Sequence, residues 1–96
     1  MIYTIPVTQA HIDRADLFDM CSNCIIAQAL KAYFQTDDVA CYLTIARVLG
    51  MMLALPQNAI AITTLAPDKW SLVEPFEFQI ASDRPDYVAA LTVTTR

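Results

Sequence analysis

The feature that most constrains the fold is an amphipathic segment between Cys21 and Phe34. Its apolar residues recur at spacings of three and four, which place them on one side of an α-helix. The residues on that side are Ile26, Ala29, Leu30, Tyr33 and Phe34. Gln28 and Lys31 fall on the opposite side, and Ser22 or Asn23 can supply the N-cap oxygen. The segment therefore predicts a principal helix, from about residue 23 to residue 34, that covers a hydrophobic core.

A second segment, Val39–Ala46, alternates between two sets of residues with a period of two, which is typical of a strand. Gly50 is the only glycine in the chain, and it separates this strand from the apolar run Met51–Leu55. The two runs predict a β-hairpin that turns near Leu49 and Gly50. A continuous helix over residues 39–55 is the alternative, since short apolar runs do not settle the period by themselves.

Weaker signals define the first part of the chain. Ile2–Ile5 is rich in strand-forming residues, and Pro6 either ends this strand or holds it at a sheet edge. Thr8 then predicts the cap of a short helix at Gln9–Asp13, with His11 or Ile12 turned inward.

The last part of the chain carries similar signals. Pro56 predicts the start of another short helix, which Pro67 stops. Asp68–Ser71 follows as a turn, and Val73–Ile80 predicts a strand whose alternate residues face water. Residues 82–96, with Tyr87–Thr95 at their centre, are expected to form an edge strand or a partly ordered tail.

Together these signals predict one α+β domain over residues 1–96, because 96 residues supply a single modest core. We expect a small antiparallel sheet of three to five strands, with the main helix on one face and one or two short helices. The predicted core residues are Ile5, Ile26, Leu30, Phe34, Leu43, Ile45, Leu53, Phe76 and Phe78.

Composition and charge exclude several classes of function. The net charge is −4 and only 17% of the residues are charged, so a nucleic-acid partner is not expected. One glycine cannot build the phosphate-binding loops of nucleotide enzymes. Residues 39–56 approach membrane-spanning length, but Arg47 lies at their middle, where inserting a charge costs roughly 2.5–3.5 kcal/mol. A transmembrane segment, and with it a membrane partner, is therefore not expected. With no basic n-region after Met1, we expect no secretory signal and a cytoplasmic protein.

Three cysteines and one histidine are the residues with reactive or metal-binding side chains. Their number would complete a Cys3His zinc site, made of His11, Cys21, Cys24 and Cys41. The ligands lack the usual local spacing, so the expected roles are a structural His11 and reduced, mostly buried thiols. Redox use of the Cys21 and Cys24 pair, or catalysis through His11, is a weaker alternative. We therefore expect no metal, no cofactor and no enzymatic activity.

Several pieces of the chain resemble a group of small uncharacterised proteins from phages and bacterial mobile elements. The similar pieces are His11-Ile12 before the cysteine-led helix at Cys24, then Leu55-Pro56, and finally the run from Val73 to Phe78 that contains Pro-Phe-x-Phe. They span most of residues 5–80. The chain departs from the group at Ile25, where a proline is common, and at Asp68-Lys69-Trp70, where an Asp-x-Gly turn is common. The resemblance implies a phage or mobile-element origin and a profile similar to inhibitors of host defence such as anti-CRISPR proteins.

The apolar content indicates how such a protein would act. Apolar residues make up 56% of the chain, and a domain of this size cannot bury all of them. The excess predicts a protein-binding surface that includes Tyr42, Met51, Met52 and Trp70, with the acidic residues Asp37 and Asp38 as a limited charged contact. The alternative is that these large side chains fill a second face of the core.

The predicted function is therefore non-enzymatic protein binding that inhibits a bacterial defence complex. Two alternatives remain: a phage structural or assembly accessory protein, and a small Cys3His zinc-binding module. The partner is expected to be a host defence complex or a second copy of the chain. A homodimer would bring the same patch together across a two-fold axis.

Overall fold

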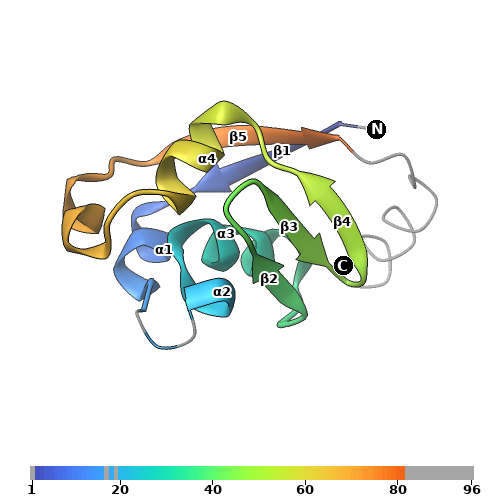
Figure 1. The fold of residues 1–96 in the computed structure, drawn as a ribbon, viewed down its shortest axis with the longest axis horizontal. Helices are drawn as coiled ribbons and strands as arrows, with labels where there is room; N and C mark the ends of the chain where they lie inside the picture. The colour runs from blue at the N-terminus through green and yellow to red at the C-terminus, as the bar shows by residue number, and fades with distance from the viewer. Residues whose placement is uncertain (1, 17, 19, 82–96) are drawn as a thin grey trace.

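The computed structural model describes residues 2–16, 18 and 20–81, and the expected edge strand or tail at residues 82–96 lies outside them. The strands are β1 (Ile2–Val7), β2 (Val39–Cys41), β3 (Ile45–Val48), β4 (Met51–Ala54) and β5 (Phe76–Ala81). The helices are α1 (Gln9–Arg14), α2 (Met20–Asn23), α3 (Ile25–Phe34) and α4 (Gln57–Thr63), with a 3-10 helix, η1, at Pro67–Leu72. The predicted α+β class is confirmed, although the five strands form two antiparallel sheets rather than one (Figure 1).

The principal helix is α3, and it begins two residues later than predicted. Cys24, rather than Ser22 or Asn23, is the N-cap residue, with extended backbone angles and a sulfur that accepts a hydrogen bond from the Ala27 N–H at 3.4 Å. The extended backbone at Cys24 separates α3 from the short helix α2. At the other end, Gln35 adopts the left-handed conformation (φ 52°) in which helices often stop. The helix is thus closed at both ends without a glycine.

The first sheet pairs β1 with β5 in a regular antiparallel register, with Ile5 opposite Phe78. Tyr3, Ile5 and Val7 alternate inward along β1. Pro6 lies within this strand and has no backbone N–H to donate, which a sheet edge tolerates. The prediction that Pro6 sits at an edge is therefore confirmed, and the strand continues through it.

The second sheet contains β2, β3 and β4 in sequence order. Leu49 (φ 53°) and Gly50 (φ 82°) form the turn between β3 and β4, as the hairpin prediction requires, and the alternative continuous helix is wrong. The single predicted strand at residues 39–46 is instead two strands. The chain reverses at Tyr42–Thr44, where the Tyr42 N–H donates to the Ile45 carbonyl at 2.8 Å.

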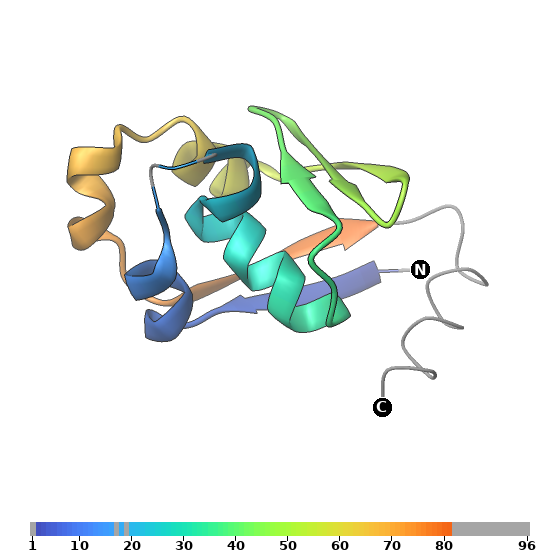
Figure 2. The same cartoon turned by 90° about the horizontal axis from the view of Figure 1, so that it is seen from below.

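The two sheets share one core because α3 contacts both β1 and β2 (Figure 2). Tyr3 of β1 meets Phe34 of α3 edge to face, with ring centroids 5.8 Å apart. Six of the nine predicted core residues are buried, namely Ile5, Ile26, Leu30, Phe34, Leu53 and Phe78. Ile45 and Phe76 are partly buried. Leu43 was wrongly assigned to the core, because the unexpected turn leaves it 62% exposed.

The predicted short helices are confirmed as α1 and α4, and α4 joins the two sheets. Asn58 donates from Nδ2 to the Glu77 carbonyl of β5 at 2.9 Å. At the other end of α4, Thr63 donates from Oγ1 to the Leu43 carbonyl in the β2–β3 turn at 2.6 Å. Each end of α4 is therefore hydrogen-bonded to a different sheet.

Candidate functional site

The outer surface of the second sheet is the candidate site, and we call it the hairpin face. Successive side chains of a strand point to opposite sides, so Val48, Met51 and Leu53 enter the core while their neighbours point away from it. The outward residues are Tyr42, Ile45, Arg47, Met52 and Ala54. Tyr42 is 45% exposed and Met52 56%, and both are large apolar side chains. The hairpin face is thus mainly apolar, with one cation.

The register of the sheet brings these side chains together. Arg47 lies directly opposite Met52, and Ile45 lies opposite Ala54. Directly opposed residues in antiparallel strands have Cβ atoms about 4.5–5.5 Å apart, so the aliphatic part of Arg47 extends the apolar surface of Met52. Leu43, in the turn next to Tyr42, adds another exposed apolar side chain at the end of the sheet.

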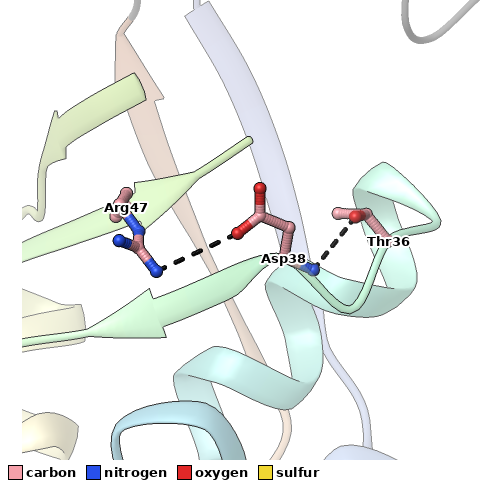
Figure 3. Close-up of polar contacts among 3 residues, drawn as sticks. All are labelled: Thr36, Asp38 and Arg47. Carbon is pink, nitrogen blue, oxygen red and sulfur yellow. Dashed lines mark hydrogen bonds and ion pairs between the residues drawn. The ribbon is translucent and has the colours of Figure 1, made fainter. Parts of the chain in front are cut away.

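Charged groups border the hairpin face where α3 leads into β2 (Figure 3). Arg47 Nη2 and Asp38 Oδ1 are 4.0 Å apart, and their side chains are 48% and 56% exposed. An ion pair this exposed contributes at most about 1 kcal/mol to folding, so both groups keep most of their capacity to bind a partner. The Asp38 N–H donates to Thr36 Oγ1 at 3.0 Å, which fixes the backbone beside the face.

The structure separates the six residues that sequence reasoning assigned to partner binding. Tyr42 and Met52 are exposed on the hairpin face. Asp38 is exposed at its border, paired with Arg47, and Asp37 is exposed in the preceding loop. Met51 and Trp70 are only 3% and 9% exposed, so the prediction that they would lie on the surface is wrong. Strand alternation forces one of two consecutive methionines inward, and the fold of η1 turns Trp70 toward the core. Leu43 is a surface residue that the sequence does not reveal, because the pattern over residues 39–46 predicts a continuous strand where the chain turns.

His11 has a structural position in α1. Its Nδ1 accepts a hydrogen bond from the Thr8 N–H at 3.0 Å, and the side chain is buried. Burial lowers the pKa of His11 below its ordinary value, and the nearby positive charge of Arg14 lowers it further. The ring is therefore neutral at pH 7 and stabilises the start of the helix.

The thiols of Cys24 and Cys41 lie together where α3 begins and β2 ends. A side-chain hydrogen bond from Cys41, with backbone N–H groups at the start of α3, lowers the pKa of Cys24 to about 7, and burial opposes this effect. Within residues 2–16, 18 and 20–81, no three His, Cys, Asp or Glu residues gather as a metal site would require. The side chain of Cys21, a member of the predicted zinc set, lies outside the described part of the structure.

A separate hollow of about 420 Å³ lies beside α3, on the side away from the core. Its lining is polar and includes Arg14, Asn23, Gln28, Lys31, Gln35, Thr36 and Asp37. Lys31 Nζ reaches Asn23 Oδ1 at 3.4 Å, and Gln28 Nε2 reaches the Arg14 carbonyl at 3.4 Å. These contacts link α2, α3 and the end of α1, so the hollow is explained by helix packing.

Comparisons with protein-family models, with curated proteins and with solved structures found no match. In the part of the chain that the structure describes, no helix combines the length and apolar character needed to cross a membrane. The function must therefore be argued from the geometry of the chain itself.

Proposed function

We propose that the protein acts by binding another protein through the hairpin face, without catalysis. The observation that supports this is the exposure of Tyr42 and Met52 on a sheet whose inner side is fully packed. Aromatic and methionine side chains are enriched in protein interfaces. Because strand alternation points Tyr42 and Met52 outward, no neighbouring element of the described fold buries them.

Charge indicates what kind of partner surface would fit. Asp38 is exposed at the border of the hairpin face, the neighbouring Asp37 is also exposed, and the chain carries a net charge of −4. A partner with an apolar centre and basic residues at its rim would complement this arrangement and associate faster at low salt. The resemblance to phage and mobile-element proteins supports a component of a bacterial defence complex, with a phage assembly component as the alternative.

The test is quantitative capture of partners from bacterial lysate with matched double variants. Tyr42→Asp with Met52→Asp places charge at the centre of the hairpin face. The control, Thr4→Asp with Gln79→Asp, places the same charge on exposed positions of the first sheet. We expect the first variant to lose at least about 10-fold in affinity and the control to match the wild type.

Three results would decide against the proposal or sharpen it. Equal capture by both double variants would exclude the hairpin face. Recovery of capsid or tail components would replace the defence complex with the assembly alternative. A dimer mass in light scattering that the Tyr42 and Met52 changes convert to a monomer would make the chain its own partner.

A further inference from the structure

The pair formed by Cys24 and Cys41 is unusual because it joins two elements that are distant in the sequence. Cys24 caps α3 and Cys41 ends β2, and 9% and 6% of these residues are exposed. A side-chain hydrogen bond joins the two cysteines. Sixteen residues, including the whole of α3, lie between the two cysteines.

The surroundings of Cys24 favour the thiolate form of its side chain more than the surroundings of an ordinary cysteine do. Its sulfur accepts the Ala27 N–H at 3.4 Å at the start of a ten-residue helix, and it also accepts from Cys41. Both contacts stabilise negative charge on this sulfur, and the thiolate is the form that attacks an oxidant. Cys41 is the second thiol, since its side chain is hydrogen-bonded to the sulfur that would be oxidised.

We propose that Cys24 and Cys41 are an oxidation site, at which hydrogen peroxide converts the two thiols into a disulfide between α3 and β2. The Cys24 thiolate attacks one peroxide oxygen, the O–O bond breaks, and Cys24 becomes a sulfenic acid while the released hydroxide takes a proton to give water. The Cys41 sulfur then attacks the Cys24 sulfur, the S–O bond breaks, and the Cys41 proton leaves with the hydroxide as a second water.

Burial restricts which oxidant can begin this reaction. Less than a tenth of each cysteine is exposed, which favours a reagent as small as peroxide over bulky disulfides. The new bond would fix Cys41 to the helix, and Tyr42 of the hairpin face is the next residue in the chain. The site itself does not depend on the proposed binding function.

Trypsin provides a direct test because Arg14, Lys31 and Arg47 divide the region into peptides 15–31 and 32–47. Cys21 and Cys24 lie in the first peptide and Cys41 in the second. The native protein is treated with peroxide at pH 7, the remaining thiols are alkylated in acid, and the digest is analysed without reductant. We expect the two peptides to be joined, with the mass of two hydrogen atoms lost, and dithiothreitol to separate them again.

Variants assign the sulfur atoms. In Cys21→Ser the link should form as in the wild type, whereas in Cys41→Ser the reaction should stop at a sulfenic acid on Cys24 that dimedone traps. A bridge within peptide 15–31, a bridge that needs Cys21, a bridge between two molecules, or oxidation without any bridge would each overturn the proposal. So would failure of the native protein to react under conditions that oxidise the urea-unfolded chain. The wild-type peptide map decides even if a variant fails to fold.

Discussion

The two sheets of this protein have the same kind of inner face, but the centres of their outer faces differ. Both contribute buried side chains to the core around α3, such as Phe78 from β5 and Val48 from β3. The outer face of the first sheet carries Thr4 and Gln79, whose side chains are within 3.5 Å of each other. The corresponding face of the second sheet carries Tyr42 and Met52. Core packing does not require large apolar side chains at outward positions. Their presence on one sheet and not at the centre of the other therefore indicates which sheet contacts a partner.

The largest effects are expected on the inner faces, where the two sheets should be equivalent. Phe78→Ala should lower the free energy of unfolding by about 3–5 kcal/mol, and Leu53→Ala in the second sheet by about 2–5 kcal/mol, because each leaves a cavity. Urea denaturation followed by circular dichroism measures both. A loss below about 0.5 kcal/mol for Leu53→Ala would mean that the second sheet does not share the core.

A smaller, pH-dependent effect is expected from α1, the helix that follows β1, because it contains His11, the only histidine. His11→Ala removes the acceptor for the Thr8 N–H and should cost about 1–2 kcal/mol at pH 7. Glutamine can accept the same bond, so His11→Gln should retain most of the stability.

The pH dependence follows from the lowered pKa of His11 in the folded protein. Protonation favours the unfolded chain, whose histidine has the ordinary pKa of 6.5. The free energy of unfolding should therefore be highest above pH 6.5 and decrease as the pH falls below it, toward the lower pKa of the folded state. His11→Gln should lack this component. Equal slopes for the two proteins between pH 7 and 5.5 would contradict the assignment.

The smallest effects should come from the two hydrogen bonds of α4, each of which serves one sheet. Thr63→Val removes the bond to the Leu43 carbonyl, and Asn58→Ala removes the bond to the Glu77 carbonyl. Each should cost about 0.5–1.5 kcal/mol. Hydrogen exchange should distinguish them, with faster exchange at the Tyr42 amide for Thr63→Val and along β5 for Asn58→Ala. The same exchange pattern in both variants would show that α4 does not hold the sheets separately.

Local signals in the sequence predicted most elements of the fold. The spacing of apolar residues gave α3, and the lone glycine located the turn between β3 and β4. The second reversal, at Tyr42–Thr44, was missed because it contains neither glycine nor proline. The sulfur cap of Cys24 was missed because cysteine is an uncommon N-cap residue.

The candidate site was predicted less completely because exposure depends on tertiary packing. Composition identified the large apolar residues, and Tyr42 and Met52 proved to be exposed, but only the register determines that Met51 points inward. Trp70 is buried within η1, where the sequence predicts only a turn at Asp68–Ser71. The contact between Cys24 and Cys41 depends on how β2 packs against the start of α3, so no local pattern could reveal it.

The pairing of β1 with β5 affects how the protein is made on the ribosome. Thr4 and Gln79 are 75 positions apart, so at 5–20 residues per second β1 waits roughly 4–15 seconds for its partner. During synthesis the local three-stranded sheet β2–β4 can form, while Tyr3, Ile5 and Val7 remain uncovered in a newly made strand. Pro6 interrupts the donors along that strand, which hinders pairing with a neighbouring nascent chain. The proline tolerated by the finished sheet thus also protects the unfinished one.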